Sequence, residues 1–129
     1  MKRYFFVSLS ILVLTLSAAC HKDHEASSAE ITFIEPSLND TIANAAELHV
    51  EGTISADGEM HSYTLKISNA ANDSVYFTKS SSQHAESYAF HEHWVNNLTD
   101  TTLVKVTVEV ELNHEGAKTS KTVNVVCLP

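Results

Sequence analysis

Strict alternation of apolar and polar residues recurs along the chain and constrains its fold more than any other feature. The segment 103–112 shows the pattern most clearly, because four valines at even positions alternate with charged residues or threonine at odd positions. Successive side chains of a β-strand point to opposite faces, so the pattern predicts a strand with one buried and one exposed face. No segment beyond residue 20 shows a sustained period of 3.6 residues. We therefore expect an all-β protein.

Seven such segments follow one another, separated by stretches rich in Asp, Asn, Gly, Pro and Ser, which favour turns. The predicted strands cover residues 31–35, 47–54, 61–69, 74–79, 86–95, 103–112 and 118–127. One of the predicted turns is Ala-Asp-Gly-Glu at residues 56–59. Seven short strands in about 100 residues predict an immunoglobulin-like or fibronectin-like β-sandwich. Residues 30–129 suffice for one such domain and are too few for two.

Residues 1–19 have the layout of a secretory signal. Lys2 and Arg3 precede an apolar run at residues 5–16, and small residues follow it. The run is shorter than the roughly 20 residues that a membrane-spanning helix needs. Export is therefore the expected fate of the chain.

The end of this signal resembles a bacterial lipobox, in which a cysteine receives the lipid and becomes the mature N-terminus. The matching stretch is Leu16-Ser17-Ala18-Ala19-Cys20. The resemblance implies lipidation of Cys20, although Ser17 stands where the usual pattern has leucine. The alternative is cleavage by ordinary signal peptidase, which would leave Cys20 and Cys127 free to pair in an oxidising compartment.

The segment after Cys20 is polar and small. Its first five residues are His21-Lys22-Asp23-His24-Glu25. A lysine followed by acidic residues resembles the signal that sends lipoproteins of the Bacteroidota to the outer face of the outer membrane. Surface exposure and a periplasm-facing anchor both remain open. Residues 20–29 as a whole lack periodicity and predict a flexible tether that carries the lipidated cysteine.

The charge of the chain excludes one class of partner. Removal of the signal takes away Lys2 and Arg3 and changes the formal charge from −8 to −10. Such a surface repels phosphate backbones and anionic lipid, so we expect no nucleic-acid partner and a membrane contact through the lipid alone. The sequence shows neither a Gly-x-Ser-x-Gly nucleophile motif nor a phosphate-binding glycine loop, so we expect no enzyme. Cys127 is interpreted as a small buried hydrophobic residue.

The chain contains eight histidines, and five of them fall into two candidate metal-binding groups. His61, His84 and His114 lie at connections that gather at one end of an immunoglobulin-like sandwich. His91 and His93 are two apart on a predicted strand and therefore share a face. Neutral imidazole nitrogen suits zinc and copper, so both groups predict a site for one of these ions.

Neighbouring residues refine this hypothesis. Met60 would add a thioether suited to copper(I) beside His61. Tyr88, Phe90 and Trp94 alternate with His91 and His93 and are expected to face the core. The alternative interpretation of exposed histidines is that they are polar spacers on a β-surface, and it is the one adopted for the remaining three. These are His21, His24 and His49.

The mature chain as a whole resembles a group of uncharacterised Bacteroidota lipoproteins built on one immunoglobulin-like domain. The short motifs that carry the resemblance are Ile31-Thr32-Phe33 with Pro36, Gly52-Thr53-Ile54, Met60-His61-Ser62-Tyr63, His91-Glu92-His93-Trp94 and Val126-Cys127-Leu128-Pro129. The resemblance implies the fold and the outer-membrane location, and it implies no activity, because that group has no agreed function.

Three turns carry a further modification motif, Asp followed by Ser or Thr and then Ile, Val or Thr. The hydroxyl residues are Thr41, Ser74 and Thr101. The triplets resemble the O-glycosylation acceptors of exported Bacteroidota proteins. Ordinary turn chemistry is the alternative explanation, because Asp, Ser and Thr favour turns in any protein.

Two functions remain open. The first is a lipid-anchored, non-enzymatic binding module of the cell envelope that binds zinc or copper and works beside an outer-membrane transport complex or another envelope protein. The second is a structural or protein-interaction domain without a metal.

Overall fold

Six β-strands and no helix make up residues 24–129, the part of the chain that the computed structural model describes. The strands are β1 (Ala29–Glu35), β2 (Thr41–Ile42), β3 (Glu47–Asn69), β4 (Val75–Val95), β5 (Thr102–Glu111) and β6 (Lys118–Cys127). The prediction of an all-β protein is confirmed. Within the same residues there is no helix that is long and apolar enough to span a membrane. The predicted signal and Cys20 lie outside the described residues.

The expected number of seven strands is wrong, because two pairs of predicted strands are each one continuous strand and because the two-residue β2 was not predicted. β3 continues through residues 56–59, where the sequence predicted a turn. β4 likewise continues across the expected break between residues 79 and 86. The pairing of β3 with β4 is nevertheless interrupted: Ser55 pairs with Ser87, and the next pair is Met60 with Ala85. Residues 56–59 therefore form a bulge, here called the β3 bulge.

The β3 bulge takes its hydrogen bonds from residues 24–28, here called the leading segment. The N–H of Ala26 donates to the Glu59 carbonyl at 3.0 Å, and the Glu59 N–H donates to the His24 carbonyl at 2.8 Å. Asp57 accepts hydrogen bonds from the same segment. The leading segment was assigned to the tether from sequence, but hydrogen bonds attach it to the folded domain.

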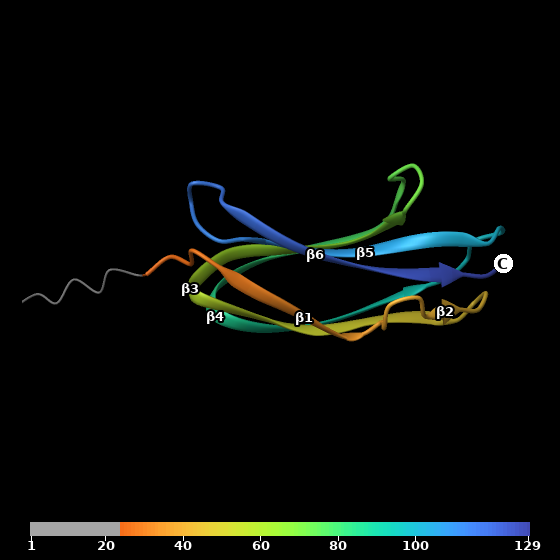
Figure 1. Cartoon of the computed structure of the whole chain (residues 1–129), viewed down its shortest axis with the longest axis horizontal. Helices are drawn as coiled ribbons and strands as arrows, with labels where there is room; N and C mark the ends of the chain where they lie inside the picture. The colour runs from red at the N-terminus through yellow and green to blue at the C-terminus, as the bar shows by residue number, and fades with distance from the viewer. Residues whose placement is uncertain (1–23) are drawn as a thin grey trace, which may run out of the picture.

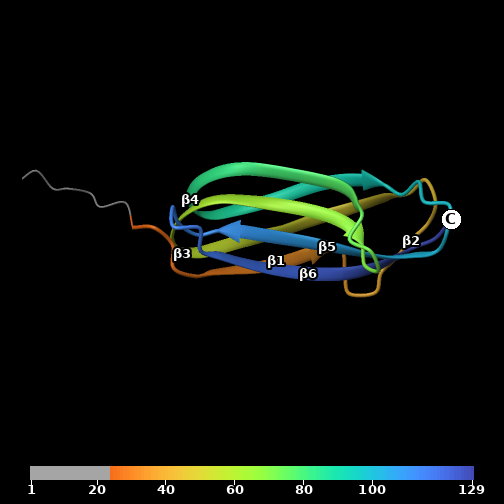
Figure 2. The same cartoon turned by 90° about the horizontal axis from the view of Figure 1, so that it is seen from above.

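The strands form one hydrogen-bonded sheet that curls into two layers (Figure 1). The strand order is β1-β3-β5-β6-β2, and β4 pairs with the other edge of β3. β1 pairs with the first half of β3 and β5 with its second half. The long β3 and β4 bend together at one end of the molecule and so run through both layers (Figure 2).

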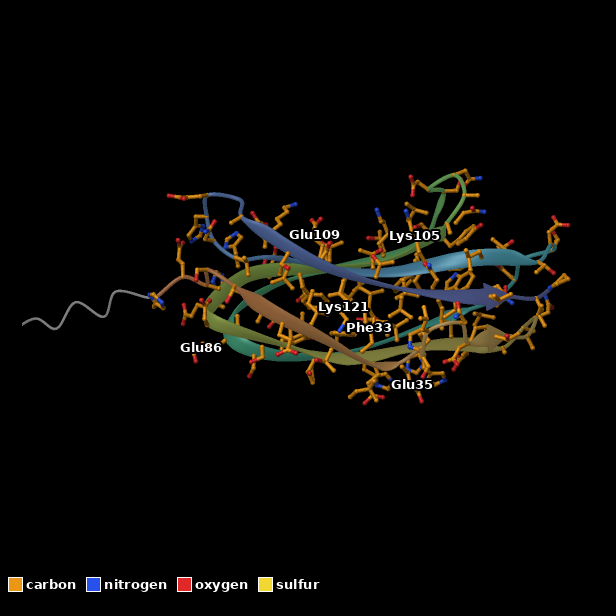
Figure 3. The ribbon with its side chains drawn as sticks, in the orientation of Figure 1. Phe33, Glu35, Glu86, Lys105, Glu109 and Lys121 are labelled. Atoms are coloured by element: carbon orange, nitrogen blue, oxygen red, sulfur yellow. The ribbon has the colours of Figure 1, made fainter. Side chains whose placement is uncertain are left out.

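The core lies between these two layers. The four valines of β5 at even positions are completely buried, as their alternation predicts. Tyr63, Leu65 and Ile67 of β3 lie beside them on the same face of the sheet, and Phe90 of β4 and Phe33 of β1 meet edge to face with ring centroids 5.7 Å apart. Figure 3 shows Phe33 between the layers. Burial of each such large side chain contributes about 1.5 to 3 kcal/mol of transfer free energy.

Two polar groups join segments that no strand pairing connects. The Lys121 ammonium of β6 donates to the Ile31 carbonyl of β1 at 2.8 Å and so links the two layers (Figure 3). The fully buried Asn96 amide donates to the carbonyls of Ile42, Ala43 and Leu128. Ile42 is the last residue of β2, Ala43 follows it, and Leu128 lies next to the C-terminal residue. Asn96 therefore holds these segments together at the end of the molecule opposite the leading segment.

Candidate metal centre

The outer face of the layer that contains β1 carries three histidines from two adjacent strands. His49 of β3 stands directly opposite His93 of β4 in the antiparallel register. His91 lies two residues before His93 and therefore projects from the same face. Phe90 on the opposite face is buried, and Tyr88 and Trp94 pack against the core. The predicted division of β4 into a histidine face and an aromatic face is confirmed.

The imidazoles of His49, His91 and His93, here called the triad, lie close enough to act on one ion. One ring nitrogen from each residue can be chosen so that all three lie within 4.8 Å of one another. The ring centroid of His93 is 4.5 Å from that of His49 and 4.6 Å from that of His91. Zinc–nitrogen bonds of 2.0 to 2.1 Å in a tetrahedral site require nitrogens about 3.3 to 3.4 Å apart. Side-chain rotation on an open surface can supply this contraction.

Carboxylates surround the triad. Glu47 Oε2 is 3.6 Å from His49 Nε2 and 3.6 Å from His93 Nδ1. Glu51 stands opposite His91 in the β3–β4 register and opposite Glu35 in the β1–β3 register. Cross-strand partners lie on the same side of a sheet, and Figure 3 shows Glu35 on the outer side of this layer. The negative charge of these groups favours a cation at this face.

The triad is open to solvent. The side chains of His49 and His93 are 44% and 43% exposed, and that of Glu47 is 53% exposed. An ion held by the three imidazoles alone would keep a fourth coordination position accessible to water or to a ligand from another molecule. Closed structural zinc sites, in contrast, use four protein ligands and leave no such position.

His49 is the triad member that sequence reasoning missed, since it was interpreted there as a polar spacer. Its partnership with His93 depends on the register between β3 and β4. The sequence does contain a usable signal, because His49 lies on the polar face of an alternating segment.

The second predicted group also comes together in space. The ring centroid of His61 is 5.6 Å from that of His84 and 4.4 Å from that of His114. We call these three residues the rim cluster. Within residues 24–129, the triad is the group whose ligand atoms all lie within 4.8 Å of one another. The ring nitrogens of the rim cluster are more widely spread.

One expectation about the rim cluster is wrong. Met60 is completely buried in the core, on the face of β3 opposite His61, so its thioether points away from the histidines. His84 contacts His61 and is seven positions before His91 on β4. At about 3.3 Å per residue this separation is roughly 20 Å, so His84 does not join the triad.

The remaining predicted positions lie as follows. Thr41, Ser74 and Thr101 are all exposed. Their modification stays a prediction. Cys127 is completely buried, and burial raises the pKa of its thiol, so it is a hydrophobic core residue as expected.

No family model matches this chain, and no curated protein matches it. Among the solved structures that it resembles is the CARDB domain of a protein from Pyrococcus furiosus, which was crystallised in complex with di-metal ions. The two chains share 15% sequence identity with a TM-score of 0.49, over 78% of this chain and 86% of that chain.

Proposed function

We propose that this protein is a non-enzymatic binding module of the cell envelope that binds one zinc or copper ion through His49, His91 and His93. The observation that carries the proposal is the approach of three ring nitrogens to within 4.8 Å of one another on one sheet face. Neutral imidazoles are preferred ligands of zinc and copper, and the hard cations magnesium and calcium prefer oxygen.

The exposure of the triad favours reversible binding. A competing ligand from another protein can approach an ion whose protein ligands are nearly half exposed. Glu47 is placed to complete the coordination or to accept the N–H of a ligating imidazole, which orients the ring. Such a site suits uptake and transfer of the ion, and we propose transfer to an outer-membrane transport complex or another envelope protein.

The proposal includes an immunoglobulin-like sandwich and a lipid anchor at Cys20. The pairing supports the sandwich: one layer holds β1 with halves of β3 and β4, and the other holds the remaining halves with β5 and β6. We propose that this pairing is an immunoglobulin-like sandwich in which two pairs of consecutive strands are continuous, with the first half of β4 in the layer of β5 and β6. Cys20 lies four residues before His24 in the sequence, and His24 is the first residue of the leading segment.

Calorimetric titration of the protein with Zn²⁺ and with Cu²⁺ tests the proposed function. We expect His49→Ala and His91→Ala each to lower the affinity of the triad for the ion by at least about tenfold, because each removes one of three nitrogen ligands. His24→Ala is the matched control, since His24 is exposed and belongs to neither histidine group. Affinity should also fall between pH 7 and pH 5, because imidazole loses its free lone pair on protonation.

The proposal fails if His49→Ala and His91→Ala bind both metals as tightly as His24→Ala does. Glu47→Gln separates two roles of the carboxylate. A loss of about 10- to 100-fold is expected if Glu47 ligates the ion or orients a ligating ring. An unchanged affinity would leave the three imidazoles as the complete protein ligand set.

One observation favours the second candidate function, protein interaction. In the described part of the chain, β4 pairs with β3 along one edge, and its other edge has no strand partner over all 21 residues. An unpaired edge exposes N–H and C=O groups to which an extended peptide can add as a further strand. Proline in place of Thr78, which lies in the half of β4 far from the triad, would disturb such a contact and leave the triad's metal affinity unchanged.

A further inference from the structure

The rim cluster occupies the end of the molecule where β3 and β4 bend, far from the triad. Its three histidines come from three separate places: His61 from β3, His84 from β4, and His114 from the turn between β5 and β6. Figure 1 shows that this turn, the bend and the start of β1 lie together at the same end. The fold therefore gathers imidazoles that are distant in sequence.

A carboxylate completes this group. Glu25 Oε1 lies 3.5 Å from His114 Nε2 and accepts a hydrogen bond from the His114 backbone N–H at 3.4 Å. Residue 25 forms an isolated β-bridge with Glu59, next to the hydrogen bonds that tie the leading segment to the β3 bulge. The neighbouring Ala26 is 2% exposed. The backbone of Glu25 is thus fixed beside the rim cluster.

The turn that carries His114 is also ordered by hydrogen bonds. The side-chain oxygen of Asn113 accepts from the N–H groups of Glu115 and Ala117, both at 3.1 Å. His114 itself is 69% exposed, so its ring can rotate. His61 borders a hollow of about 430 Å³ lined also by Ser62 and Glu111, so solvent reaches this group from one side.

Three imidazoles and one carboxylate are a full set of ligands for four-coordinate zinc. The set would place one negative charge and three neutral rings around a divalent ion. The rings already approach to 4.4 and 5.6 Å between centroids, and rotation of the exposed His84 and His114 can bring their nitrogens to bonding distance. No rearrangement of a strand is needed.

We propose that His61, His84, His114 and Glu25 form a second transition-metal site, separate from the triad. It differs from the triad in what it connects. An ion at this place would join β3, β4, the β5–β6 turn and the leading segment, four parts of the chain that meet at the end where β3 and β4 bend. Occupation of this site therefore stiffens the attachment of the leading segment to the domain.

The number of ions bound by each variant tests this second site. The protein is titrated with Zn²⁺ alone at pH 7, and calorimetry gives the stoichiometry and affinity. We expect two ions for the unaltered protein and for the control His24→Ala. The rim variant His61→Ala/His114→Ala and the triad variant His91→Ala/His93→Ala should each bind one ion. Glu25→Gln should lower the affinity of the rim cluster for its ion by at least about tenfold, because it removes a charged ligand.

Two measurements by nuclear magnetic resonance test whether the second ion binds at the rim cluster. In the triad variant, one equivalent of Zn²⁺ should shift the ring-nitrogen resonances of His61, His84 and His114. Exchange of the Ala26 and Glu59 amide protons through local opening should slow by up to about tenfold at a free zinc concentration ten times the dissociation constant, because the ion stabilises the closed state alone. Circular dichroism verifies that each variant remains folded.

The outcomes separate the two sites. A rim variant that binds as many ions as the unaltered protein with equal affinity overturns the second site, as do unshifted rim resonances in the triad variant at one equivalent of zinc. If instead the triad variant keeps every ion that the unaltered protein binds and the rim variant loses one, the second site stands and the proposed function at the triad is wrong.

Discussion

Asp57 is one exposed residue that holds two segments of the chain together. Its carboxylate accepts hydrogen bonds from the Ser27 hydroxyl, from the Ser27 N–H at 2.8 Å and from the Ser28 N–H at 2.9 Å. The Ser27 hydroxyl is the largest cause, and the two backbone amides add to it, in holding the pKa of this carboxyl well below its usual range. Hydrogen bonds to the charged form favour that form, so the contact depends on an ionised Asp57.

The contact of Asp57 with the leading segment should therefore depend on pH. A folded-state pKa below the unfolded value of about 3.9 means that the stabilisation is complete above that pH and is lost as the pH falls through the folded-state pKa. We expect the protein to be more stable than Asp57→Asn at pH 6, with faster amide exchange of Ser27 and Ser28 in the variant. The difference should shrink progressively below about pH 4.

Urea unfolding and hydrogen exchange across this pH range make the comparison. Glu30→Gln, which removes a carboxylate from an exposed position of β1, is the control. A difference between protein and Asp57→Asn that stays constant down to pH 2 would contradict the assigned role of the carboxylate. Equal exchange of Ser27 and Ser28 at pH 6 would contradict it as well.

At the scale of elements, Asn96 joins three segments at the end of the molecule opposite the leading segment. Its side-chain nitrogen donates to three carbonyls, and its side-chain oxygen accepts from the Leu98 N–H at 3.1 Å. Asn96→Ala leaves buried carbonyls without donors, which should cost about 1 to 3 kcal/mol of unfolding free energy. The neighbouring exposed Asn97→Ala should change it by less than about 0.5 kcal/mol.

Equilibrium denaturation of both variants measures this cost. The loss should be accompanied by faster exchange of the Leu98 amide and of the Leu128 amide, whose N–H donates to Ile42. An Asn96→Ala variant as stable as Asn97→Ala would show that water replaces the amide at no cost.

The strands also show how much of this fold can be predicted from the sequence. Alternation predicted the buried faces of β4 and β5 correctly, because a period of two depends on local geometry alone. The residue types at 56–59 predicted a turn, because Asp and Gly favour turns. The structure uses the same residues for a bulge that the leading segment completes through long-range hydrogen bonds. No local pattern contains that partner.

Two site residues were misinterpreted from the sequence, and for different reasons. His49 reaches the triad through its pairing with His93, and pairing is a property of two strands. Met60 directly precedes His61, and neighbours along a strand face opposite sides, so burial of one implies exposure of the other. Alternation alone was sufficient to exclude Met60 as a partner of His61, and pairing was needed to include His49.

At the scale of the whole molecule, the two histidine groups lie toward opposite ends. The leading segment and the rim cluster share one end, and β2 and the C-terminus share the other (Figure 2). Glu47, beside the triad, begins β3 at the end that holds β2. A chain anchored through Cys20 would therefore carry the rim cluster near the membrane and the triad on the far half.

The anchor itself is tested by the mass of the mature N-terminus and by fractionation. We expect a diacylglyceryl thioether on Cys20 and recovery of the protein with membranes. Cys20→Ala should abolish the modification and release the protein, because a surface with a formal charge of −10 offers no attraction to anionic lipid. Cys127→Ala is the control, since that thiol is buried in the core. An unmodified Cys20 in the mature protein would contradict the proposal of a lipid anchor.

The continuity of β3 gives this arrangement a fixed dimension. From Ser55, next to the bulge, back to His49 the strand pairs with β4 at every position. Those six steps span roughly 20 Å at about 3.3 Å per residue. Over these residues the ladder of hydrogen bonds is unbroken, so the distance between the β3 bulge and His49 is fixed. The triad therefore lies at a constant distance from the β3 bulge and from the leading segment that is hydrogen-bonded to it.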